Sequence, residues 1–172
     1  MRTRETTSLQ EPTQMTKRIL STIAVLLGAA SAASAQTATQ TVTFQVDAIN
    51  QIAFAGSPSL VINTATAGSN PTSVTAAATW AVTTNQTGAK ITASIGSNMP
   101  AGLTLSANLA APAGASTAGS QSLSTTSVDL VTSITKLAQG ALAVNYSLAA
   151  TAAAGVVSST TRTVTYTITG GT

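Results

Sequence analysis

The sequence contains no cysteine and no histidine, and only 6% of its 172 residues are charged. Its two glutamates, Glu5 and Glu11, both lie close to the N-terminus. Without His or Cys, no Ser-His or Cys-His nucleophile can form, and zinc and copper lose their usual ligands. Neither of the glycine-rich phosphate-binding patterns occurs. We therefore predict that the protein is not an enzyme and that it holds no cofactor and no metal.

Two side-chain carboxylates remain after residue 35, those of Asp47 and Asp129. A glycosidase needs two carboxyl groups at a controlled separation, and calcium needs oxygen ligands at a regular loop spacing, which neither aspartate has. Both aspartates stand in the polar register of alternating runs, beside Thr, Gln or Ser. They are therefore interpreted as solvated charges that discourage edge-to-edge pairing of strands.

The formal net charge of +3 arises mainly near the N-terminus. After residue 35 three basic side chains face two acidic ones, so the net charge there is +1. A nucleic-acid-binding protein needs a clustered basic face, and we expect no nucleic-acid partner. Four of the seven basic residues come earlier, namely Arg2, Arg4, Lys17 and Arg18.

The first 35 residues have the layout of a secretory leader. Lys17 and Arg18 precede an apolar run over 19–27, and small residues then end at Ala35 in an Ala-x-Ala pattern. We predict a Sec-type signal peptide cleaved after Ala35, with Met15 as the alternative start. The run is shorter than the about 20 residues that span a membrane, so no transmembrane span is expected in the mature chain. The protein is expected to be extracellular or at the cell surface, with the periplasm as an alternative.

Alternation of apolar and polar residues predicts strands with one buried face along residues 36–172. Gly, Pro and Asn clusters separate the runs, and Gln139-Gly140 is interpreted as the turn of a hairpin. About eight to ten short strands are typical of a sandwich. We predict an all-β fold, a single antiparallel β-sandwich domain of immunoglobulin-like type. The clearest runs cover residues 41–48, 79–84, 90–95, 103–109, 128–135, 142–148 and 163–169.

Trp80 is the only tryptophan. It could offer a stacking surface to a sugar, but it shares its strand face with Val82, and burial is the commoner outcome for so large an apolar side chain. We therefore place Trp80 in the core.

The first run of the mature chain carries an apolar stripe of Val42, Phe44 and Val46. A terminal strand of this type can be added to the sheet of a neighbouring subunit, where main-chain hydrogen bonds give affinity and alternate side chains give register. The more ordinary outcome is pairing within its own sheet. These three residues are the candidate self-association site.

Two further stretches carry a resemblance. Residues 98–105 (NMPAGLTL) and 162–169 (RTVTYTIT), together with the leader, resemble secreted Thr- and Ala-rich bacterial surface proteins. The chain is similar in texture to fimbrial subunits, spore-coat-U-like proteins and WxL-type surface domains, which implies a sandwich fold. It departs from them in having Trp80-Ala81-Val82 in place of Trp-x-Leu, and in lacking the disulfide of many fimbrial and coat subunits.

Two functions follow as expectations. The first is a secreted structural protein of the cell surface, a self-associating fimbria-like or coat-like subunit whose partner is itself or another surface protein. The alternative is an extracellular module that binds carbohydrate or another surface. The loops over 97–102 and 111–120 contain few aromatic or charged residues, which counts against tight ligand recognition.

Overall fold

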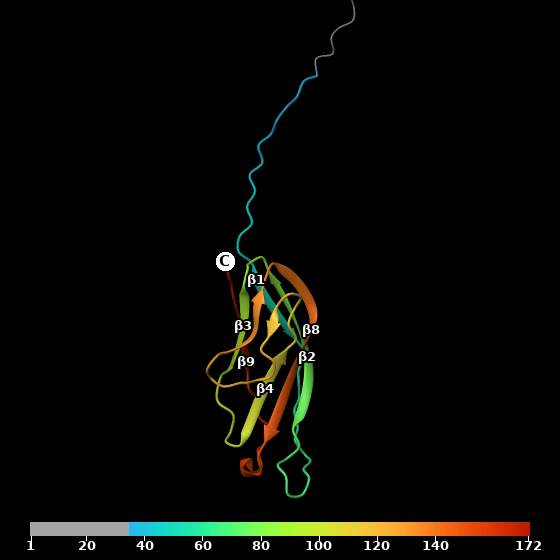
Figure 1. Cartoon of the computed structure of the whole chain (residues 1–172), viewed down its shortest axis with the longest axis vertical. Coiled ribbons are helices and arrows are strands. Elements are labelled where there is room, and N and C mark those ends of the chain that lie inside the picture. Colours follow the sequence, from blue (N-terminus) through green and yellow to red (C-terminus); the bar gives the residue numbers. More distant parts are fainter. Residues whose placement is uncertain (1–34) are drawn as a thin grey trace, which may run out of the picture. The chain divides into compact units, whose positions relative to one another are not determined.

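The computed structural model describes residues 35–172, which contain nine β-strands in two antiparallel sheets (Figure 1). The predicted leader up to residue 34 and the alternative start at Met15 lie outside the described residues. No helix within residues 35–172 has the length and apolar character needed to cross a membrane. The described residues also contain a short 3-10 helix, η2 (Ala152–Ala154), which lies between the last two strands.

The two sheets differ in size but share one architecture, in which each strand pairs antiparallel with its neighbours. The larger sheet has the order β1 (Asn50–Ala55), β2 (Val74–Thr84), β8 (Leu137–Ala150), β4 (Leu103–Leu109) and β6 (Gln121–Ser122). The smaller sheet has the order β5 (Ser116–Thr117), β7 (Val128–Ile134), β3 (Ala89–Ile95) and β9 (Val164–Thr169).

The core lies between the sheets because each strand turns every second side chain inward. Strand β3 shows the pattern fully, with Ala89, Ile91, Ala93 and Ile95 buried and the residues between them partly exposed. Inward side chains of both sheets join in a single apolar cluster. Trp80 is its largest member and is only 1% exposed. The predicted all-β sandwich is confirmed, and so is the placement of Trp80.

The predicted hairpin at Gln139-Gly140 is wrong. Strand β8 runs through these residues, and the chain turns instead between β7 and β8, where Lys136 has φ of 40°. Trp80 on β2 pairs with Leu142 on β8, and Val82 pairs with Gln139. Two steps along β2 therefore correspond to three steps along β8. The extra residue is a β-bulge, which shifts the apolar alternation by one position. A turn would interrupt the alternation in the same way, so the two cannot be told apart from the pattern alone.

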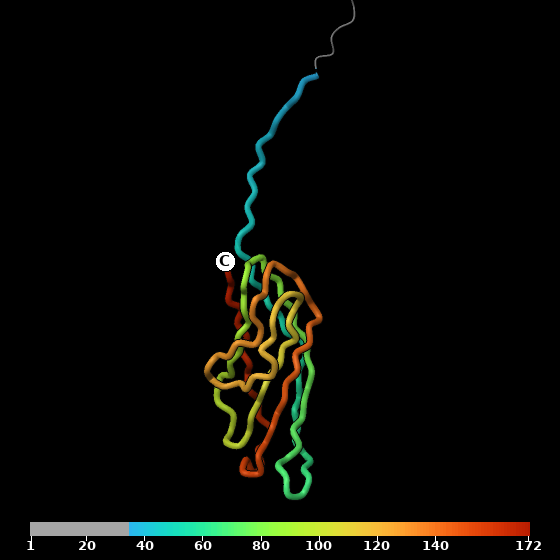
Figure 2. The backbone as a smooth tube through the Cα atoms, in the orientation of Figure 1, coloured from blue at the N-terminus to red at the C-terminus, as the bar shows by residue number. Residues whose placement is uncertain are grey.

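The domain formed by residues 45–172 has two distinct ends (Figure 2). We call the end that holds Asn85 and Lys136 the root end. There the Lys136 N–H donates to the Gln86 carbonyl oxygen at 2.9 Å and joins the two turns. The other end, the loop end, holds the long loop over 56–73 and η2. Ala152 N–H donates to the side-chain oxygen of Asn70 at 3.1 Å and joins these two loop-end segments.

Candidate functional site

Residues 35–49 belong to no strand of the described chain. The apolar stripe predicted on this segment is exposed to solvent: Val42 is 72% exposed, Phe44 89% and Val46 77%. Pairing of residues 41–48 within their own sheet, the more ordinary expectation, is therefore not what the structure shows. The nearest strand, β1, begins only at Asn50. Three large apolar side chains on a strand-like pattern are thus left without an intramolecular strand partner among the described residues.

The end of this segment is held at the root end by one side chain, that of Asn85. Its Nδ2 donates to the Asp47 carbonyl oxygen at 2.7 Å, and its Oδ1 accepts from the Ile49 N–H at 2.8 Å. The Asn85 N–H also donates to the Ile49 carbonyl oxygen at 3.2 Å. Together these bonds extend the β1–β2 ladder past its last pair, Asn50 with Thr84. The amide side chain takes the place of a strand partner and fixes where the segment joins the domain.

Replacing Asn85 with alanine is expected to release this junction while the sandwich stays folded. Each lost hydrogen bond contributes about 0.5 to 1.5 kcal/mol, so the amide of Ile49 should exchange with deuterium about tenfold faster or more. Hydrogen exchange followed by NMR measures this directly. The matched control is Asn98→Ala, because the Asn98 side chain also accepts from a backbone N–H in a loop, that of Thr125 at 3.3 Å. Equal exchange at Ile49 in both variants would contradict the role of Asn85.

The sandwich has one side with two substantial unpaired edges. Strand β1 ends the larger sheet and β9 ends the smaller one, and each is six residues long without a charged residue or a proline. On the opposite side the edge strands β6 and β5 have only two residues each. Short edges and edge charges are the usual protections against strand addition. The side bounded by β1 and β9 lacks both protections.

The inward side chains along β1 and β9 are only half-buried, whereas those of β3, the neighbour of β9, are fully buried. We call these half-buried side chains the open side. They pack against the main core and remain partly accessible to water. The open side consists of Ile52 and Phe54 from β1 and of Val164, Tyr166 and Ile168 from β9.

Aromatic contacts hold the two edges of the open side together. The rings of Phe54 and Tyr166 are stacked with centroids 3.8 Å apart, and Phe54 also lies 6.0 Å from Trp80. The hydroxyl of Tyr166 is 2.7 Å from that of Tyr146 on β8. Burial, and then this hydrogen bond, raise the pKa of Tyr166 well above its ordinary value. Tyr166 therefore stays protonated at alkaline pH, where an exposed tyrosine would ionise, and keeps its hydrogen bond across the core.

Family models, curated proteins and solved structures gave no match to this chain. Its function has to be argued from its own residues. The resemblance to secreted Thr- and Ala-rich surface proteins stays a prediction.

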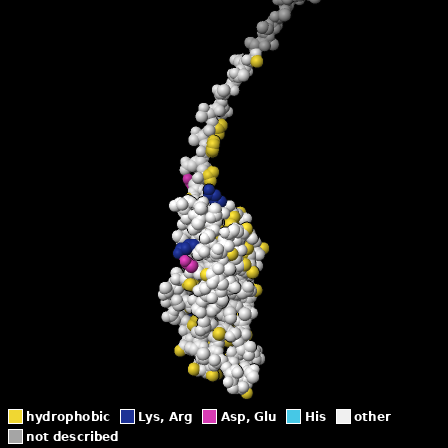
Figure 3. All heavy atoms as spheres, in the orientation of Figure 1, with side chains coloured by type: hydrophobic (Ala, Val, Ile, Leu, Met, Phe, Trp, Pro, Cys, Tyr) yellow, Lys and Arg dark blue, Asp and Glu magenta, His cyan; other side chains and the backbone are white. Residues whose placement is uncertain are grey.

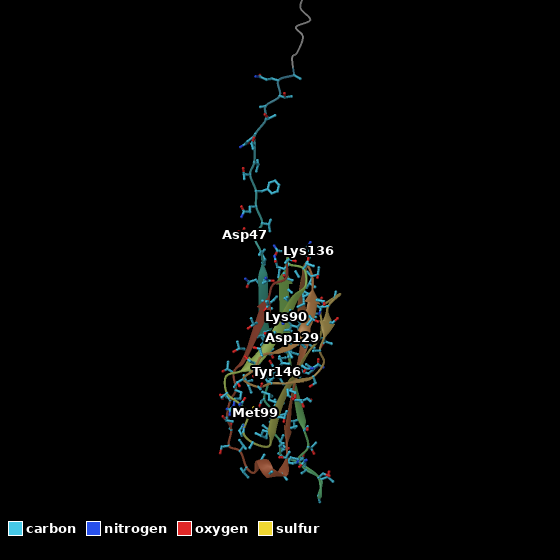
Figure 4. The ribbon with its side chains drawn as sticks, turned by 60° about the vertical axis from the view of Figure 1, so that its left-hand side comes forward. Asp47, Lys90, Met99, Asp129, Lys136 and Tyr146 are labelled. Carbon is cyan, nitrogen blue, oxygen red and sulfur yellow. The ribbon has the colours of Figure 1, made fainter. Side chains whose placement is uncertain are left out.

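The two aspartates lie in different parts of the domain and have different hydrogen-bond partners (Figure 4). Asp129 on β7 accepts from Lys90 on β3 at 3.0 Å, with both side chains nearly half exposed (Figure 4). Asp47 lies at the root end, near Lys136 in the same view, and its carboxylate accepts from Gln45 Nε2 at 2.7 Å. Within residues 35–172 no three His, Cys, Asp or Glu side chains come together as a metal site. The carboxylates thus act as surface charges, and the face seen in Figure 3 is largely uncharged.

Sequence reasoning missed two parts of this site. Asn85 stands in an Asn-Gln-Thr-Gly stretch, one of the Gly, Pro and Asn clusters that separate the predicted strands. Its partners lie 36 and 38 residues earlier in the chain, so no local pattern marks them. The open side was missed because alternation marks which face of a strand is inward, but says nothing of which strands end a sheet. Trp80 is excluded as a stacking surface for a sugar because it is buried.

Proposed function

We propose that this protein is an exported, non-enzymatic structural subunit of the cell surface, which self-associates through its N-terminal segment. The observation that carries the proposal is the exposure of Val42, Phe44 and Val46 on a segment with strand-like alternation. Large apolar side chains displayed together in this way are typical of an interaction site. A segment of alternating pattern is suited to strand addition, in which it pairs with the free edge of another sheet.

The composition supports the same proposal. Residues 36–172 contain no His, Cys or Glu, so the side chains that most catalytic sites use are missing. Few charges protect the sheet edges, and unprotected edges are open to pairing with a strand of another chain. The leader over residues 1–35 is consistent with export to the cell surface.

The test compares two chains that are exported with their own leader and purified after processing. One is the unaltered protein, and the other lacks residues 36–48. We expect the first to form filaments or large oligomers in electron microscopy and light scattering, and the second to be a monomer with the same far-UV circular dichroism spectrum. N-terminal sequencing of the first checks cleavage after Ala35.

Two results would contradict the proposal. If both chains are monomeric over the accessible concentration range, the protein does not self-associate, and a glycan array then tests the carbohydrate-binding alternative. If the truncated chain assembles as well as the unaltered one, assembly does not depend on this segment.

A further inference from the structure

We infer that residues 41–48 of one copy, the donor strand, pair antiparallel with the outer edge of β9 in a second copy. This inference rests on the proposed function and adds the acceptor, the direction and the register. The acceptor edge is available, because β9 pairs only with β3 among the described strands. The β9–β3 register is also continuous over all six residues, with no bulge that would twist the edge away from a partner.

Both faces of the donor strand match both faces of β9. The inward residues of β9 are apolar and half-buried, and they repeat at every second position like the stripe of the donor strand. The outward residues of β9 are all threonine, and those of the donor strand are Thr41, Thr43, Gln45 and Asp47. An added strand lies about 4.8 Å from its neighbour, so the stripe would extend the apolar layer of the open side. Strand addition would thereby cover side chains that are exposed in both copies.

Strand β1 is the weaker acceptor, although its outer edge is also free. Its inward positions include only two large apolar side chains, those of Ile52 and Phe54. The third inward residue is Asn50, whose Oδ1 accepts from Thr84 Oγ1 at 2.7 Å. Moreover, β1 is followed directly by Gly56 with φ of 107°, which turns the chain away from the strand direction. The polar Asn50 would face an apolar side chain of the donor strand, a pairing that β9 avoids.

The direction follows from the positions of the charged residues. Arg162 immediately precedes β9 and bonds only to backbone carbonyls and a threonine hydroxyl, with no carboxylate partner among the described residues. Asp47 follows the stripe of the donor strand. Antiparallel pairing places Asp47 opposite Thr163, at the same end of β9 as Arg162, whereas parallel pairing places Asp47 and Arg162 at opposite ends. The register that aligns the stripes pairs Val46 with Val164, Phe44 with Tyr166 and Val42 with Ile168.

This direction also decides the form of the assembly. Asp47 is bonded at the root end of its own domain, and Arg162 lies toward the loop end, where its side chain donates to the Asn98 carbonyl oxygen. Antiparallel pairing, which brings Asp47 to the Arg162 end of β9, thus places the root end of one copy against the loop end of the next. Such a head-to-tail contact joins different surfaces of the two copies, and it can continue into an open filament.

Cysteine cross-linking tests the register, because the chain has no cysteine of its own. In the inferred register Thr43 is opposite Thr167, and directly opposed residues of antiparallel strands have Cα atoms about 4.5 to 5.5 Å apart, within disulfide reach. Exported Thr43→Cys and Thr167→Cys chains are mixed and oxidised. We expect a disulfide-linked dimer, with the joined peptides identified by mass spectrometry. The matched controls pair Thr43→Cys with Thr163→Cys, four residues out of register, and with Ala53→Cys on β1.

Light scattering on the same mixtures separates failure of this inference from failure of the proposed function. If the mixture assembles and Thr43→Cys links to Ala53→Cys or Thr163→Cys as readily as to Thr167→Cys, the acceptor or the register is wrong while self-association stands. If a chain carrying both Thr43→Cys and Thr167→Cys forms only an internal disulfide, the strand docks on its own domain and the inference is overturned. If nothing assembles and nothing links, the proposed function and the inference fail together.

Discussion

A variant with Val42→Ser, Phe44→Ser and Val46→Ser is expected to fold normally and to remain a monomer where the unaltered protein assembles. In the single chain these side chains are mostly exposed, and exposed substitutions usually change stability by less than about 0.5 kcal/mol. In the assembly each would be buried, which stabilises by about 1.5 to 3 kcal/mol for each large apolar side chain. Losing all three should weaken association by on the order of a thousand-fold or more.

Analytical ultracentrifugation over a concentration series measures this effect, and urea unfolding confirms that the fold is retained. The matched control is Thr41→Ser, Thr43→Ser and Gln45→Ser, which alters three residues on the opposite face of the same segment. That variant should assemble nearly as well as the unaltered chain. If both triple variants lose assembly equally, the apolar stripe is not what drives it.

Replacing Trp80 with alanine is expected to have the largest effect on the stability of the domain. Trp80 is the largest of the fully buried side chains and packs beside Phe54 on the neighbouring strand β1. Truncation of a buried Trp to Ala typically costs about 3 to 5 kcal/mol, because transfer free energy is lost and a cavity remains. The total free energy of unfolding of a domain of this size is about 5 to 15 kcal/mol. The variant should therefore unfold at a much lower urea concentration or fail to fold.

Far-UV circular dichroism is the appropriate probe, since the substitution removes the only tryptophan. Trp80→Phe serves as the milder comparison, because it keeps a ring in the core. It also removes the indole Nε1, a buried nitrogen that has no hydrogen-bond partner among the described residues. We expect a clearly smaller loss for Trp80→Phe than for Trp80→Ala. A loss below about 1 kcal/mol for Trp80→Ala would contradict the central place of this residue in the core.

The two substitutions act on different properties of the molecule. The stripe lies outside the sandwich, so its loss should change association and leave unfolding unchanged. Trp80 lies inside, so its loss should change unfolding first. Association and unfolding are therefore measured on both variants. The comparison distinguishes assembly of folded domains from aggregation of unfolded chains.

The amino-acid sequence by itself determined the fold class and the content of the core. In a strand successive side chains point to opposite faces, so a two-residue period shows which residues turn inward without knowledge of the partner strands. Trp80, Ile91 and Val144 could be placed in this way, and each is buried in the structure. The absence of His and Cys is likewise a property of the sequence alone.

Tertiary structure decided which strands pair and which edges stay free. The bonds that define a strand join residues far apart in the chain, such as Asn85 with Ile49 or Trp80 with Leu142. For the same reason the pattern at Gln139-Gly140 predicts a turn where the structure has a bulge on β8. A bulge is defined by the number of residues on the partner strand, here β2, that lie opposite it. The alternation over residues 41–48 predicts strand-forming capacity, but only the three-dimensional arrangement shows that the domain provides these residues with no strand partner.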